Sequence, residues 1–265
     1  MNSMKSMRFS YARSRCRIIR MQIEQLAPDL FIAVGETYHA NSTVFVRGDD
    51  ALLVDGMGSI ADATELRHLL EDELRKEVRF IISTHYFSDH LAALRLFPRA
   101  EIVAHELYAQ TFATERHRTA EEEAHFVEPT MVIGDRMRMK WGRFTLDLFH
   151  NPGHTMSTLA IDVPEADLLF VGDTVVGNLV YLAYSAPEVF TFALERLERR
   201  RRARIVTSHG GAVSSAALGH ARHYLGRLTA GEVTLEACLP EGVTGTDFER
   251  IFHDRNLETL RTRLS

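Results

Sequence analysis

The chain has 265 residues, of which 45% are hydrophobic, 25% charged and 9% aromatic, the balance of a soluble globular protein with enough apolar material for a sizeable core. Its net charge of -5 gives no electrostatic reason to bind nucleic acid, and its longest uncharged run, residues 205–221, is too short and too polar to cross a membrane. Cys16 and Cys238 are the only cysteines, so we expect no disulfide framework and a reducing, cytoplasmic environment.

The first twenty residues differ from the rest of the chain because they are basic and contain no acidic residue. No apolar stretch of secretory length follows them, which argues against a signal peptide and leaves a transit peptide as a less favoured alternative. We expect residues 1–20 to form a disordered basic arm, or translation to begin at Met21. Residues 21–265 are predicted to form a single domain with a helical C-terminal appendage.

Strands are predicted where short β-branched or apolar runs lie between turn signals. The Arg47-Gly48-Asp49-Asp50 and Trp141-Gly142-Arg143 segments predict hairpins. The expected strands are residues 42–46, 51–55, 79–83, 101–104, 136–140, 144–149, 159–163, 167–171 and 204–207.

Helices are predicted from capping patterns and from apolar residues at helical spacing. Ser59 with Asp62 predicts a helix that continues to about Lys76, and Ser185 with Glu188 predicts the start of another. Shorter helices are expected at residues 91–97 and 105–112, and the chain after residue 207 is expected to be helical. Residues 113–129 are charged and unperiodic, and Glu121, Glu122 and Glu123 within them are expected to be a solvated surface.

Candidate metal ligands follow four of the predicted strands. Histidine nitrogens and carboxylate oxygens are ligands that zinc and iron accept, and loops at strand ends expose them. The candidates are His85, Asp89, His90, His154, Asp173 and His209.

In this order and spacing, the residues resemble the metallo-β-lactamase-fold hydrolase superfamily, whose signature is a His-x-His-x-Asp-His loop followed by a His, a bridging Asp and a final His. The resemblance runs from about residue 41 to residue 228 and includes Asp55 at a strand end and the Pro-Gly-His-Thr segment at residues 152–155. It implies an α/β fold of four layers, an αββα sandwich of two mixed β-sheets with outer helices.

The resemblance also implies how the ligands divide between two metal positions. Asp89, His90 and His209 would form the second position, with Asp173 bridging, and the first would take His85, residue 87 and His154. Residue 87 is phenylalanine, which has no lone pair to donate. We therefore expect one tightly held ion, with a second bound more weakly, and His105 and His150 are less favoured substitute ligands. Zinc is the expected metal, with iron or manganese as alternatives.

The expected reaction is hydrolysis, because a divalent metal lowers the pKa of coordinated water toward about 7 and polarises a carbonyl oxygen. By resemblance, Asp89 is the catalytic proton acceptor, and Asp55 is expected to hold the ligand loop. Phe87 would be an apolar wall, and Tyr181 and Tyr184 could overhang the site, although ordinary packing is favoured for both tyrosines.

The substrate is expected to be a small ester, thioester, lactone or amide, and no nucleic-acid or membrane partner is predicted. The alternatives are an iron-dependent oxygenase of the sulfur-dioxygenase type and a degenerate, non-catalytic binding protein. The oligomeric state stays open.

Overall fold

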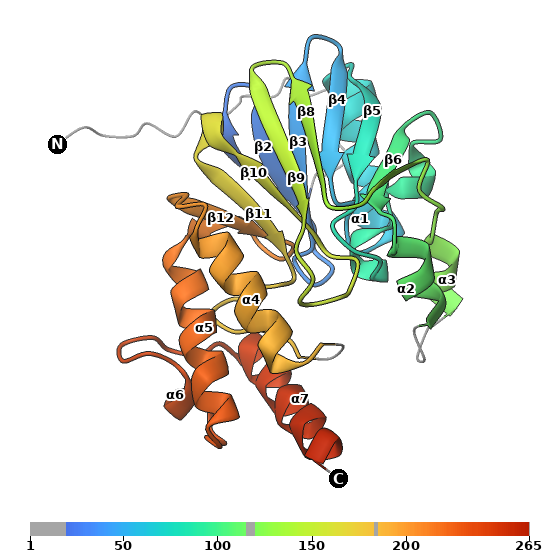
Figure 1. Ribbon diagram of the computed structural model, residues 1–265. Helices are drawn as coiled ribbons and strands as arrows, with labels where there is room; N and C mark the ends of the chain where they lie inside the picture. Colours follow the sequence, from blue (N-terminus) through green and yellow to red (C-terminus); the bar gives the residue numbers. More distant parts are fainter. Residues whose placement is uncertain (1–19, 115–119, 183–184, 265) are drawn as a thin grey trace, which may run out of the picture.

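The computed structural model describes residues 20–114, 120–182 and 185–264 and contains two β-sheets with helices outside them (Figure 1). The predicted N-terminal arm falls almost wholly outside the described residues. No helix in the described ranges is long and apolar enough to span a membrane.

The first sheet has seven strands in the order of the sequence. Its first four strands are joined by antiparallel hairpins, and the last three are added in parallel. The strands are β1 (Gln22–Ala27), β2 (Leu30–Val34), β3 (Asn41–Arg47), β4 (Asp50–Val54), β5 (Glu77–Ile82), β6 (Glu101–His105) and β7 (Met131–Ile133).

The second sheet has six strands in the order β13-β12-β11-β10-β9-β8. Only the β11–β12 pair in it is parallel, and the chain crosses between these two strands through a helix. The strands are β8 (Arg136–Trp141), β9 (Phe144–His150), β10 (Leu159–Val163), β11 (Leu168–Gly172), β12 (Arg204–Thr207) and β13 (Ala212–Ser214).

Apolar side chains from both sheets form the central core. Phe45 of β3 meets Phe144 of β9 edge to face at 5.3 Å between ring centroids, and the indole N–H of Trp141 donates to the Phe45 carbonyl at 3.0 Å. Two further apolar clusters lie on the outer faces of the sheets, beneath the helices. Because each sheet is covered on both faces, its central strands are buried along their whole length. The predicted four-layer αββα sandwich is confirmed.

The outer layers are formed by helices, and α4 and α5 lie side by side over the second sheet (Figure 1). The helices are α1 (Ile60–Arg67), α2 (Tyr108–Thr114), α3 (Ala120–His125), α4 (Pro187–Glu198), α5 (Ala216–Thr229), α6 (Leu235–Cys238) and α7 (Asp247–Leu264). A π-helical segment, His68–Glu73, continues α1, and 3₁₀ turns lie at Ser88–His90, Leu94–Leu96 and Pro164–Ala166.

The Ser59 cap is confirmed, because its side chain accepts the Asp62 backbone N–H. The Ser185 cap is wrong: α4 begins after Ala186 without a side-chain cap, and Pro187 in its first turn favours helix initiation.

Three other boundaries differ from the sequence expectation. His105 does not start a helix but ends β6, where pairing with β7 continues the sheet through it. The segment expected to be unperiodic surface contains the short helix α3. The chain after residue 207 is not wholly helical, because Ala212–Ser214 forms edge strand β13.

Candidate metal centre

The first three candidate ligands come from the loop after β5. A 3₁₀ turn, Ser88–His90, closes when the backbone N–H of His90 donates to the Phe87 carbonyl at 3.0 Å. This turn brings Asp89 and His90 back beside His85. The compact loop therefore supplies ligands to both candidate metal positions.

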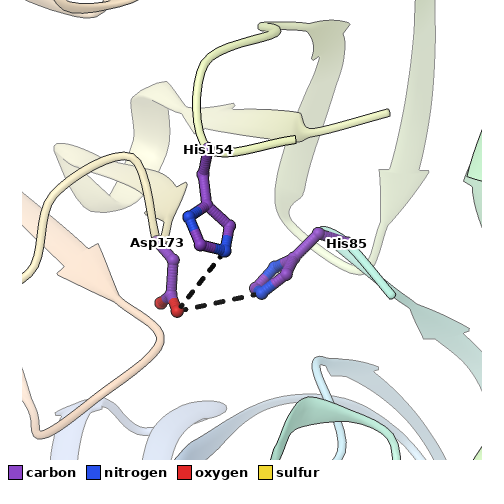
Figure 2. A group of neighbouring side chains, drawn as sticks. All are labelled: His85, His154 and Asp173. Carbon is purple, nitrogen blue, oxygen red and sulfur yellow. Dashed lines mark ion pairs between the residues drawn. The ribbon is translucent and has the colours of Figure 1, made fainter. Parts of the chain in front are cut away.

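The carboxylate of Asp173, directly after β11, lies at the centre of the cluster. Its Oδ2 atom is 3.8 Å from Nε2 of His85 and 4.0 Å from Nε2 of His154, and Figure 2 shows these side chains converging from separate segments. The same oxygen is 3.4 Å from Nε2 of both His90 and His209. One oxygen atom is thus shared by imidazoles on two sides.

Asp89 completes the side of the cluster that carries His90 and His209. Its Oδ2 atom lies 3.5 Å from Nε2 of His90 and 3.6 Å from Nε2 of His209. In the described part of the chain, the groups able to hold a metal ion are His85 with His154 and Asp173, and Asp89 with His90 and His209. The six sequence-predicted ligands are therefore brought together in two neighbouring groups.

Buried polar atoms at the centre fit a cation. Nε2 of His85 and Oδ1 of Asp173 are inaccessible to solvent, and neither makes a hydrogen bond within the described residues. Leaving such atoms without a partner costs about 1 to 3 kcal/mol each. Coordination by an ion would satisfy them, and imidazole nitrogens with carboxylate oxygens are the donor set that zinc uses.

The electrostatics of the cluster keep its carboxylate charged. Burial opposes ionisation of Asp173, but His209 and His90 outweigh it and hold the pKa of Asp173 well below its usual range. Burial also opposes protonation of His90, yet Asp89 and Asp173 raise the pKa of His90 to about 10. Burial and the neighbouring His90 push the pKa of His85 well below its usual value, so its imidazole is neutral and able to donate a lone pair.

Asp55 links the loops that carry the ligands. Its carboxylate accepts the backbone N–H of Thr84 at 2.8 Å and the Thr84 hydroxyl at 2.9 Å, and the Ser208 hydroxyl lies 3.4 Å from Oδ2. Thr84 Oγ1 is in turn 2.9 Å from Nδ1 of His85. Burial raises the pKa of Asp55 to about 6. This contact set supports the prediction that Asp55 holds the ligand loop.

Phe87 lies against the first candidate position. Its ring centroid is 5.5 Å from that of His85 and 4.9 Å from that of His154, and its ring packs against the outer core of the first sheet. The predicted apolar wall therefore occupies the position at which the resemblance implies a third imidazole.

His105 and His150 do not join either group of candidate ligands. Their rings stack on each other at 3.8 Å, and Nδ1 of His105 accepts the Leu107 backbone N–H at 3.1 Å. Nε2 of His150 lies 2.7 Å from the Met156 carbonyl. The pair is held by its own local contacts.

Other residues at the site carry no sequence motif. The Tyr38 carbonyl lies 3.0 Å from Nδ1 of His209, and the ring of Phe248, from α7, lies 5.7 Å from that of His209. Tyr181 is 5.9 Å from His154 between ring centroids, whereas Tyr184 is outside the described residues. A backbone carbonyl leaves no trace in a sequence pattern, and Phe248 reaches the site only through the packing of α7.

Three solved structures with the same fold bear the name metallo-β-lactamase. The enzyme from Pontibacter korlensis aligns at TM-score 0.66 and 22% identity, over 78% of this chain and 99% of that chain. One from Erythrobacter litoralis, solved with beta mercaptoethanol in the active site, aligns at TM-score 0.62 and 17% identity, over 77% and 95%. DIM-1, exposed to ceftazidime, aligns at TM-score 0.64 and 18% identity, over 80% and 98%.

The sequence comparison defines the class. The pattern of the metallo-beta-lactamase superfamily matches residues 35–209, and the protein belongs to this superfamily. A curated relative, the atrochrysone carboxyl ACP thioesterase of Claviceps purpurea (strain 20.1), is 23% identical over 205 residues. That match covers 72% of this chain and 59% of the relative, so the chain spans less than two thirds of the thioesterase's length.

Proposed function

We propose that the protein is a metal-dependent hydrolase of a small ester, thioester, lactone or amide. The observation that carries this proposal is the convergence of four imidazoles on one carboxylate oxygen of Asp173, with Asp89 beside two of them. Among these substrate classes, a thioester is favoured because the curated relative bears the name of a thioesterase.

The tighter metal position would be held by Asp89, His90 and His209 with Asp173, and the weaker one by His85 and His154 with Asp173. A divalent metal such as zinc supplies a Lewis acid and lowers the pKa of coordinated water toward about 7. The asymmetry rests on Phe87, whose ring offers no electron pair to the weaker position.

Asp89 is the proposed proton acceptor. Its side chain is 27% exposed, whereas those of His90, Asp173 and His209 are at most 10% exposed, so Asp89 is the member of the tighter position most open to solvent. An accessible carboxylate within reach of the ligands can take the proton that hydrolysis releases. The buried histidines instead fix the geometry.

The test is elemental analysis of the purified full chain together with a panel of acyl thioesters, lactones, amides and phosphoesters. We expect about one zinc per chain, hydrolysis of thioesters, and loss of at least about 100-fold in kcat in Asp89→Asn, the lower end of what a general base contributes. Asp49→Asn is the matched control, because Asp49 is fully exposed in the turn at the opposite end of β4 from Asp55.

Three outcomes would contradict the proposal. Bound zinc without hydrolysis of any member of the panel would indicate a binding protein. Bound iron with oxygen uptake would favour the oxygenase alternative. Full activity in Asp89→Asn would remove Asp89 from its assigned role.

A further inference from the structure

A continuous row of aromatic rings borders the metal centre on the side of His154 and His209. Starting at Phe87, the row passes His154 and reaches Tyr181, whose ring centroid is 4.9 Å from that of Phe252. Phe252 is 4.8 Å from Phe248, which lies beside His209. Three of these rings, Tyr181, Phe248 and Phe252, are neither candidate ligands nor part of the ligand loop, and we call these three the aromatic row.

The aromatic row comes from two segments that are far apart in the sequence. Tyr181 belongs to the stretch that follows Asp173, and the two phenylalanines lie one turn apart on α7. All three side chains are only partly buried, although they pack against the outer core of the second sheet. They therefore combine an anchored edge with apolar surface that remains accessible beside the ligands.

Buried polar contacts fix α7 in this position. Glu249 is 1% exposed, and its carboxylate accepts the backbone N–H of Asn178 at 2.6 Å and the backbone N–H of Thr246 at 2.7 Å. Gly177 makes this close approach possible, because its φ is +63° and an added Cβ would lie 2.4 Å from the Glu249 carboxylate. The first turn of α7 is thus tied to the segment that carries Asp173.

A second anchor lies two turns further along α7. The fully buried amide of Asn256 accepts the backbone N–H of Leu182 at 2.7 Å and donates to the Val180 carbonyl at 2.7 Å and to the Tyr224 hydroxyl at 3.0 Å. These bonds hold the backbone on both sides of Tyr181. Because the anchors hold both segments, the aromatic row does not have to be ordered when a substrate binds.

We infer that the aromatic row is the specificity-determining surface for the acyl part of the substrate, and that this acyl part carries an apolar ring. The inference rests on the proposed hydrolase function. Ring pairs favour edge-to-face or offset contacts at about 4.5 to 7 Å between centroids, the spacing already adopted between these aromatic and histidine rings. A ring-bearing acyl group would add one more ring beside Phe248, whereas an acetyl group has no ring to offer.

The test compares benzoyl and acetyl thioesters of one thiol, and the binding of benzoate and acetate, on the zinc-loaded full chain. We expect Phe248→Ala to lower the benzoyl-to-acetyl ratio of kcat/KM by about tenfold, the upper range of a single ring pair. Benzoate affinity falls to a similar extent, and acetate affinity is unchanged. Phe248→Leu, which keeps an apolar side chain and a filled site, is expected to lose most of the preference as well.

Phe192→Ala is the matched control, because Phe192 is 67% exposed on α4 and belongs to none of these contacts. Hydrolysis of both thioesters with an unchanged ratio in both Phe248 variants would overturn the inference and leave the hydrolase proposal standing. Benzoate binding that is lost in the Phe248 variants, with no hydrolysis by the wild type, would support the ring-binding surface and reject the hydrolase proposal. A reduced ratio in Phe192→Ala would also overturn the inference.

Discussion

The two candidate metal positions are expected to differ in affinity, and single histidine variants measure the difference. His90 lies 3.4 Å from Asp173 and 3.5 Å from Asp89, so it belongs to the four-donor position and contacts both of its carboxylates. Loss of a residue that merely supports a ligand already costs 10- to 100-fold in metal affinity. We therefore expect His90→Ala to weaken zinc binding by at least about 100-fold, or about 2.7 kcal/mol.

His209→Ala is expected to match His90→Ala, because His209 has the same two carboxylate neighbours at 3.4 and 3.6 Å. Of the two carboxylates in the cluster, His85 pairs with Asp173, at 3.8 Å, and its removal leaves the four-donor position complete. We expect His85→Ala to weaken the tight ion by less than about tenfold, below the range for ligand-supporting residues.

The assay is a zinc competition titration with a chromophoric chelator, together with elemental analysis after dialysis against zinc buffer. His68→Ala serves as the control, because His68 is a half-exposed histidine on the outer helical segment. Equal loss of zinc in the His85, His90 and His209 variants would refute the asymmetric assignment. So would retention of zinc in His90→Ala.

Three further outcomes are expected. Phe87→His places an imidazole beside His85 and His154, so a second equivalent of zinc is expected. Elemental analysis that still shows one equivalent would contradict the claim that Phe87 weakens the first position. Asn256→Ala removes three buried hydrogen bonds and should lower the free energy of unfolding by about 3 kcal/mol in urea titrations; a loss below about 0.5 kcal/mol would contradict the anchoring of α7. Burial and His150 lower the pKa of His105 to about 4, so its stabilising contribution is present above pH 6.5 and is lost as the pH falls through 4. Between pH 7 and pH 4 the wild type should therefore lose more stability than His105→Asn, whose amide oxygen can still accept the Leu107 N–H, and parallel pH profiles would contradict this.

Much of the fold was accessible from the sequence because the central strands are apolar along their length and are separated by turn signals. The strands that were not predicted, β1, β2, β7 and β13, include both edges of the first sheet and one edge of the second. Edge strands have pairing partners on one side only, and β1 and β13 are largely exposed, so these two lack a continuous apolar pattern. β2 is fully buried and apolar, so this reason does not apply to it. The start of α4 depends on Pro187 in its first turn rather than on a side-chain cap.

The residues of the candidate site were easier to predict from the sequence than the edge strands of the sheets. Ligand types at strand ends predicted His85, His154 and Asp173 as metal-ligand candidates, and the family resemblance implied that they share one position. The structure brings their ligand atoms together. The surroundings were not predictable in the same way. Tyr38 contributes a backbone carbonyl, and Phe248 reaches His209 only because α7 packs against the outer apolar cluster of the second sheet, so neither leaves a local pattern.

The shared position of Asp173 has a mechanical consequence for the sandwich. His85, Asp89 and His90 follow a strand of the first sheet, and His154, Asp173 and His209 follow strands of the second. A cation held among them would crosslink the two sheets at one edge, so sliding of one sheet over the other would require breaking coordination bonds. The loaded protein should for this reason unfold as one unit, and removal of the ion should loosen that edge before the Phe45 and Phe144 centre gives way.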